Sequence, residues 1–170
     1  TYMMPAIQEQ GYVMQVKDST ALFLQVIVSA RNLQGEVSLL AHSKSVPKFA
    51  EKSTLKDGKT VFLVNKNNLG DGITSITLFD NNQQPVCERL YFKRPTQSLA
   101  LSAKTDKKQY APREKITIDL TSALNTTPAI ADLSVSVYLV DSLPAPEQTF
   151  IESYLGLTSD LKGTVESPGY

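Results

Sequence analysis

Residues 72–92 carry the feature that most limits how this chain can fold, an alternation of side chains on both sides of a polar turn. Before the turn, Ile76 and Leu78 fall on one side of an extended chain, and Thr77 falls on the other. After the turn at residues 81–84, Val86, Leu90 and Phe92 alternate with Cys87, Arg89 and Tyr91. Because alternation of this kind is typical of a sheet with one buried face, the stretch predicts a β-hairpin.

The first 94 residues contain further strand patterns, separated by turn residues. They lie at residues 11–17, 21–29, 36–43, 46–55 and 60–64. Pro47 suits an edge strand because proline cannot donate to a ladder, and the Asp57-Gly58 pair predicts a tight hairpin. With the hairpin at 72–92, about seven strands are predicted in the domain 1–94. This strand density is typical of an immunoglobulin-like β-sandwich.

A second β-sandwich domain is predicted over residues 95–170, after a short linker around Pro95. Its strand patterns lie at residues 99–103, 115–121 and 129–140, with a polar turn at 125–128. The last run alternates most regularly, and Leu133, Val135, Val137 and Leu139 share one face. The fold class is therefore all-β, with two tandem immunoglobulin-like domains.

One short helix is predicted near the C-terminus, over residues 147–159. Apolar side chains recur there at helical spacing, and Gly163 is placed to end the helix. Four or five strands are few for a complete sandwich. The helix therefore covers an otherwise open face of the second domain, or a continuation of the chain completes that domain.

Charge and composition narrow the classes of partner. The chain has 17 basic and 17 acidic residues, so it lacks the positive charge with which nucleic-acid binders neutralise phosphates. No apolar run approaches the roughly 20 residues that span a bilayer. Cys87 is the single cysteine, so an intrachain disulfide and a thiolate metal cluster are both excluded.

Residues that could carry catalysis do not form a coherent set. His42 and Cys87 would be a base and a nucleophile, but they come from different predicted strands. Ser-x-x-Lys occurs at Ser45, Ser53 and Ser159 without the companion motifs of acyl-transferring enzymes. The Gly-Lys-Thr run at 58–60 lacks the preceding glycine of a phosphate loop. We therefore expect no catalytic residues, no cofactor and a protein that is not an enzyme.

Two binding hypotheses rest on loop and aromatic residues. The polar stretch 80–84, with Asp71 nearby in sequence, offers oxygen ligands for a weak calcium site. Asp and Asn also bond their own backbone in turns, so a plain turn explains the same residues. Exposed tyrosines could stack on sugars, but the chain has no tryptophan, and tyrosines scattered over strands are typical of core edges.

Several motifs together resemble a known family. They are LGDGITSITLFD (69–80), PVCERLYF (85–92), YAPREKI (110–116), ADLSVSV (131–137) and SYLGLTSDLKG (153–163). The family comprises large envelope proteins of anaerobic Gram-negative bacteria. In these proteins, tandem macroglobulin-like sandwiches precede a carboxypeptidase-regulatory-like or TonB-dependent-receptor-plug-like region. The resemblance covers nearly the whole chain and implies a periplasmic, outer-membrane-associated location.

The chain departs from true macroglobulins at one position, because Cys87 is followed by Glu88 and Arg89 and no thioester segment is present. We expect the chain, which runs from Thr1 to Tyr170, to be a piece of a longer protein. The sequence predicts a non-catalytic structural and interaction module whose partners are flanking domains of that protein. The alternative is a module that binds a polysaccharide or an envelope protein and is linked to outer-membrane uptake.

Overall fold

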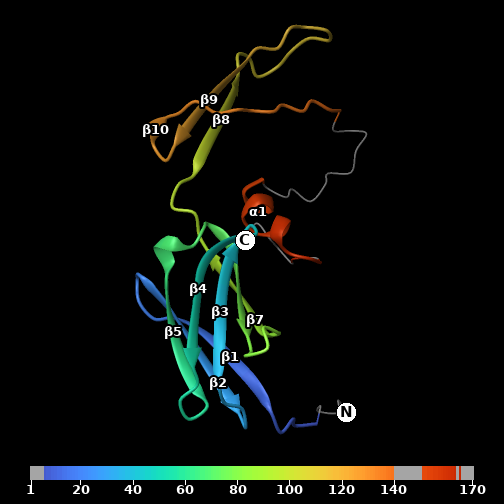
Figure 1. The fold of residues 1–170 in the computed structure, drawn as a ribbon. Coiled ribbons are helices and arrows are strands. Elements are labelled where there is room, and N and C mark those ends of the chain that lie inside the picture. Colours follow the sequence, from blue (N-terminus) through green and yellow to red (C-terminus); the bar gives the residue numbers. More distant parts are fainter. Residues whose placement is uncertain (1–5, 140–150, 164, 166–170) are drawn as a thin grey trace. The chain divides into compact units, whose positions relative to one another are not determined.

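A computed structural model describes residues 6–139, 151–163 and 165 (Figure 1). The chain divides into two compact units. The first unit comprises Thr1–Arg94 and Thr149–Tyr170, and the second comprises Pro95–Gln148. The described residues are mostly β with one short helix near the C-terminus, as the sequence predicts, and their strands form three antiparallel sheets.

Seven strands build the first unit, and each was predicted to within about two residues at either end. They are β1 Gly11–Asp18, β2 Phe23–Arg31, β3 Glu36–Ser43, β4 Val46–Thr54, β5 Lys59–Asn65, β6 Gly72–Phe79 and β7 Pro85–Lys93. One sheet has the strand order β1-β2-β5, and the other has the order β4-β3-β6-β7. All neighbouring strands are antiparallel. Pro47 lies on β4, which is an edge strand.

One apolar core joins the two sheets of the first unit. Strands β2 and β3 bury every second residue, as alternation requires. The buried cluster draws on both sheets: Met14, Leu24, Val26, Val28, Phe62 and Val64 come from one, and Val37, Leu39, Ala41, Ile76 and Leu78 from the other. The two sheets therefore face each other across a shared interior.

A single polar pair lies among these apolar side chains in the part of the chain that the structure describes. The hydroxyls of Ser43 on β3 and Thr74 on β6 are 2.7 Å apart, and both residues are buried. Because each hydroxyl satisfies the other, the pair avoids the penalty of an unpaired buried polar group.

Two-residue turns connect consecutive strands at two places in the first unit. Asp57 and Gly58 both have positive φ, and the backbone groups of Lys56 and Lys59 bond each other in both directions at 2.9 Å. These features define the predicted tight turn, which connects β4 of one sheet to β5 of the other, so the two strands do not pair beyond the single bridge at Lys56 and Lys59. Lys44 and Ser45, between β3 and β4, also have positive φ, although neither is a glycine.

From Cys87 onward, strand β7 turns toward the core the side that carries Cys87 and Tyr91, and Val86, at the bulge, also packs against the core. Cys87 pairs with the buried Leu78, and Cys87 and Tyr91 pack against the core. Leu90 is 50% exposed and Phe92 is 42% exposed. A β-bulge near Phe79 shifts the register at the start of the strand, and the register decides which face points inward.

The second unit contains one small sheet of strand order β10-β9-β8. Its strands are β8 Leu99–Thr105, β9 Ile118–Leu124 and β10 Thr127–Pro128. Asn125, with φ of 57°, occupies the predicted turn between β9 and β10. None of the described residues of this unit is buried. The strand predicted at 115–121 begins later than expected, at Ile118.

The predicted strand over residues 129–140 is wrong for its described part. Residues 129–139 form no strand, and Val137 is 90% exposed. Alternation makes a segment suitable for a sheet, but a strand also needs a neighbour to accept its backbone hydrogen bonds. After the turn at 125–128, strand pairing is therefore limited to the short pairing of β9 with β10.

The predicted C-terminal helix is confirmed in its described part and is shorter than expected. Helix α1 spans Ile151–Gly156, and a separate 3-10 turn follows at Thr158–Asp160. Gly156 ends α1 early, which agrees with the low helix propensity of glycine. Residues 147–150, where the helix was predicted to begin, lie outside the described residues. A Cβ added at Gly72 of β6 would lie 2.7 Å from the Gly156 carbonyl oxygen, so α1 approaches β6 closely.

Candidate functional site

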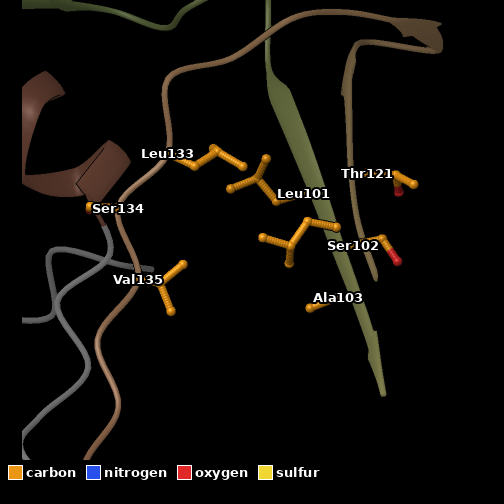
Figure 2. A pocket seen from close by; sticks show the side chains of 8 residues that line it. Leu101, Ser102, Ala103, Thr121, Leu133, Ser134 and Val135 are labelled. Carbon is orange, nitrogen blue, oxygen red and sulfur yellow. The ribbon is translucent and has the colours of Figure 1, made fainter. Parts of the chain in front are cut away.

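An open apolar groove of about 180 Å³ lies in the second unit. Its lining comes from β8, β9 and the extended segment that follows β10 (Figure 2): Leu101, Ser102, Ala103, Leu120, Thr121, Leu133, Ser134 and Val135. In Figure 2, Leu133 of the extended segment points toward Leu101 of β8. Ser102 and Thr121 point the other way, so the groove is lined mainly by aliphatic side chains.

The pairing of β8 with β9 explains why one face of this sheet is apolar. Ala103 pairs with Leu120, and Leu99 pairs with Leu124. Residues directly opposite each other share a face, so these side chains gather on one side. The other side carries two polar pairs, Ser102 with Thr121 and Lys104 with Asp119, and one pair of small residues, Ala100 with Ala123. The sheet therefore has one face suited to burial.

Leu133 and Val135 cover only part of the apolar face. Leu101 remains 59% exposed and Leu120 remains 48% exposed. Further along the same segment, Val137 and Leu139 are still more exposed, at 90% and 68%. Exposed aliphatic side chains gathered on one element are typical of surfaces that contact another protein.

A loop ordered by hydrogen bonds connects β8 to β9. The Asp106 amide donates to the Thr117 carbonyl at 3.1 Å, and the Thr117 amide donates to Asp106 Oδ1 at 3.2 Å. The hydroxyl of Tyr110 donates to the same Asp106 oxygen and accepts the Lys107 amide at 3.0 Å. Polar contacts therefore fix this loop without a core beneath it.

Both acidic residues of the loop are engaged within it. Lys107 Nζ donates to Glu114 Oε1, and the Ala111 amide donates to Glu114 Oε2 at 2.8 Å. Hydrogen bonding from Lys107, and then from Ala111, lowers the pKa of Glu114. The bond from Tyr110 is the main cause of a lowered pKa at Asp106. The sequence places these residues between strands but does not reveal this network.

His42 and Cys87 do not form a catalytic pair. His42 lies on β3 and Cys87 on β7, and β6 runs between these strands. Cys87 packs against the core, whereas His42 alternates with the buried Ala41 and Ser43 and so lies on the outer face. The buried Nδ1 of His42 has no hydrogen-bond partner among the described residues.

The thiol of Cys87 behaves as a packing group. Its Sγ lies 3.5 Å from the Tyr12 carbonyl oxygen, in a half-buried position. Burial raises the pKa of this thiol, against smaller lowering effects from Arg89 and a backbone hydrogen bond. A neutral thiol is a poor nucleophile, so the site lacks the activation that catalytic cysteines require.

The loop at residues 80–84 is a turn, as the simpler interpretation predicts. Asp80 Oδ1 accepts the amides of Asn82 and Gln84, each at 2.9 Å. Asp71, the other proposed calcium ligand, lies 3.6 Å from Lys93 Nζ in an ion pair. The structure does not bring the two carboxylates into one cluster: in residues 6–139 and 151–163 no group of three metal-binding side chains forms.

The remaining sequence motifs have structural roles. Gly58 lies in the hairpin turn after β4, and Ser53 Oγ pairs with Thr60 Oγ1 at 2.6 Å. Ser159 Oγ donates to the Leu155 carbonyl at 3.5 Å. Tyr12 and Tyr91 pack at the core edge, as predicted for scattered tyrosines.

No protein-family model matches the chain, and no curated protein matches it. The class of protein is therefore defined by the fold alone, a mostly β chain with one sandwich-like unit and one open unit. Neither α1 nor the 3-10 turns of the described residues has the length and apolarity to cross a bilayer.

Proposed function

We propose that this chain is a non-catalytic structural and interaction module of a larger, periplasmic, outer-membrane-associated protein. The observation that carries the proposal is the uncovered apolar face of β8 and β9. A sheet with one apolar face gains stability when that face is buried, at roughly 25 cal/mol per Å². A flanking domain of the same longer protein is the partner that we assign to this face.

Strand order supports an immunoglobulin-like, macroglobulin-like identity for the first unit. Its sheets, β1-β2-β5 and β4-β3-β6-β7, correspond to an immunoglobulin sandwich in which the fourth strand pairs with the third. The second unit is then a further sandwich of the same type whose second layer is supplied from outside the described residues. The resemblance to envelope proteins supports the location.

Photo-crosslinking tests the structural role. A benzophenone amino acid replaces Leu101 in the full-length protein, expressed in the cells that make it. We expect ultraviolet light to join position 101 to a peptide of a neighbouring domain. The matched control replaces Asn82, which is exposed in the turn between β6 and β7, and should give no such product. Crosslinks from position 101 only to residues near Leu133 would mean that the chain itself closes the groove.

The second candidate function is binding of a polysaccharide or protein ligand linked to outer-membrane uptake. The observation that favours it is the concentration of Lys and Arg residues on the loop between β8 and β9. A glycan array, combined with pull-down from envelope extract, separates the two functions. A saturable ligand would establish binding, and its absence from both experiments would leave the structural role alone.

A further inference from the structure

Most of the positive charge in the second unit lies on the loop between β8 and β9. Four of the five Lys and Arg residues of Pro95–Gln148 lie on this loop, residues 106–117: Lys107, Lys108, Arg113 and Lys115. The fifth, Lys104, lies on β8 and pairs in register with Asp119 of β9. The loop also holds two acidic residues, so four positive charges minus two negative charges leave a formal charge of +2. The chain as a whole has no net charge. The loop is therefore a local basic patch on a neutral protein.

The two acidic residues of the loop do not pair with all of its basic residues. Glu114 pairs with Lys107, and Asp106 is held by Tyr110 and by the Thr117 amide. Lys108 directly follows Lys107, and Arg113 directly precedes Glu114, so each is a sequence neighbour of one member of the Lys107–Glu114 ion pair. Within the part of the chain that the structure describes, Lys108, Arg113 and Lys115 form no ion pair, and all three are exposed.

Arg113 occupies a backbone position that favours glycine. The Glu114 amide donates to the Ala111 carbonyl at 3.1 Å across a turn, with Pro112 and Arg113 as the central residues. Arg113 has φ of 64°. A turn with proline second and a positive φ third is type II, for which glycine is preferred at the third position. An arginine there is less favourable for folding, by about 1–2 kcal/mol.

We propose that this loop is a binding site for a carboxylate-bearing polysaccharide, with Lys108, Arg113 and Lys115 as its anion-binding residues. The planar guanidinium of Arg113 matches a carboxylate in two parallel hydrogen bonds. Charged groups repeated along a polysaccharide would meet several of these cations together. The hydrogen-bonded network fixes the backbone of the loop before the ligand arrives, which reduces the entropy lost on binding.

Other polyanions fit the loop less well. Nucleic-acid affinity depends on neutralising many phosphates, and this loop offers only four basic residues, one of which is paired with Glu114. Loops that enter membranes carry large apolar side chains beside the basic residues. The loop holds one exposed large aliphatic side chain, Ile116, and one aromatic ring, Tyr110, whose hydroxyl is already bound to Asp106. A carboxylated sugar polymer is therefore the ligand class that the charge and polarity favour.

This proposed site rests on the second candidate function, and it specifies the class of ligand for that function. Polygalacturonate is the probe, and its fully methyl-esterified form, which lacks the charges, is the matched ligand control. We expect polygalacturonate to shift the amide resonances of residues 104–117 in the complete chain, and the esterified polymer to leave them unchanged. Added salt should weaken the binding because the contacts are exposed.

Two variants of Arg113 separate binding from folding. Arg113→Gln and Arg113→Gly should each weaken polygalacturonate binding about fivefold. Arg113→Gly should keep or improve protection of the Glu114 and Thr117 amides from hydrogen exchange, because glycine relaxes the turn. Arg31→Gln, which removes an exposed arginine from β2, is the matched protein control and should bind as the unchanged chain does.

Unchanged binding by both Arg113 variants would overturn the site, as would equal binding of the esterified polymer. Tighter binding of single-stranded DNA or of anionic lipid vesicles at the same amides would overturn the ligand class. A glycan-array hit whose binding shifts amides outside residues 104–117 would retain the second candidate function and reject this loop. No array hit and no polygalacturonate binding would reject both.

Discussion

The two units of this chain use the same kind of strand but stabilise it differently. The first unit buries Leu24, Val26, Leu39 and Leu78 completely or almost completely between two sheets. In the second unit, Leu101 and Leu120 occupy equivalent alternating positions and remain about half exposed. The difference shows that alternation of apolar and polar residues provides an apolar face, whereas stability requires a second layer to cover that face.

Local order in the second unit comes from polar contacts. Asp106, Tyr110 and Glu114 hold the loop between β8 and β9 through hydrogen bonds to exposed partners. Exposed hydrogen bonds and ion pairs contribute little net stability, because water competes for the same groups. We therefore expect the first unit to unfold cooperatively and the second to depend on its partner.

Leu78→Asp should give the largest effect. Leu78 is fully buried in the core of the first unit, and an unpaired carboxylate there would destabilise it by about 4 kcal/mol or more. Hydrogen exchange should show loss of protection throughout β1 to β7 and no change in β8 and β9. Leu101→Asp, at a 59% exposed position of the second unit, is the matched control and should be nearly neutral. Simultaneous loss of protection in both units would mean a shared core.

Thr74→Val should have the next largest effect. It removes one hydroxyl of the buried pair and leaves Ser43 Oγ without its partner, which should reduce the free energy of unfolding by about 1–3 kcal/mol. Urea denaturation measures the change. The double variant Ser43→Ala with Thr74→Val should recover part of the loss, because no unpaired hydroxyl remains. A double variant that is less stable than Thr74→Val would contradict this explanation.

Gly58→Ala should destabilise the first unit by about 1–2 kcal/mol. Gly58 has φ of 71°, and an added Cβ would lie 2.7 Å from the Ala30 carbonyl oxygen. Gly11→Ala is the control, because a Cβ added there would meet no atom within 4 Å and the backbone of Gly11 lies outside the left-handed region. Thermal unfolding should separate the two variants, and equal melting temperatures would show that the hairpin turn adjusts.

The smallest effect should be a pH dependence confined to the second unit. The pKa values of Asp106 and Glu114 are lowered by hydrogen bonds in the folded loop. A lowered pKa stabilises the folded loop above the ordinary carboxyl range, and this contribution is lost as the pH falls through the folded values. An NMR titration should show the loop amides losing protection in that acidic window, while β1 to β7 stay protected.

Tyr110→Phe is the control for this titration. The Tyr110 hydroxyl is the main cause of the lowered pKa at Asp106, so its removal should return that pKa toward the ordinary value. Glu114 should keep its lowered pKa, because its main hydrogen-bond donor is Lys107. An unchanged Asp106 titration would show that the Tyr110 bond is not formed in solution.

Sequence patterns located all seven strands of the first unit because their causes are local. Alternation, turn residues and the Asp57-Gly58 pair act over a few neighbouring positions, and each agrees with the final fold. The orientation of β7 was harder to predict. Its outward side carries Leu90 and Phe92, and a bulge together with pairing to Leu78 decided which side faces the core.

The candidate site could not be predicted from the sequence for the same reason. The groove needs β8, β9 and the segment at Leu133 to meet, and none of these contacts is local. The basic residues of the loop can be read from the sequence. The hydrogen bonds of Asp106 with Tyr110 and of Glu114 with Lys107 cannot. The positive φ at Arg113 also arises only in the folded turn.

By itself the sequence determined the β class, the positions of the strands in the first unit and the presence of a short helix near the C-terminus. Tertiary structure alone decided which faces are buried. It also left residues 129–139 without a paired strand, despite their regular alternation. The physical reason is that backbone hydrogen bonds and apolar burial both need a partner surface. Alternation with a period of two specifies which side of a strand is apolar, but it does not specify which surface covers that side.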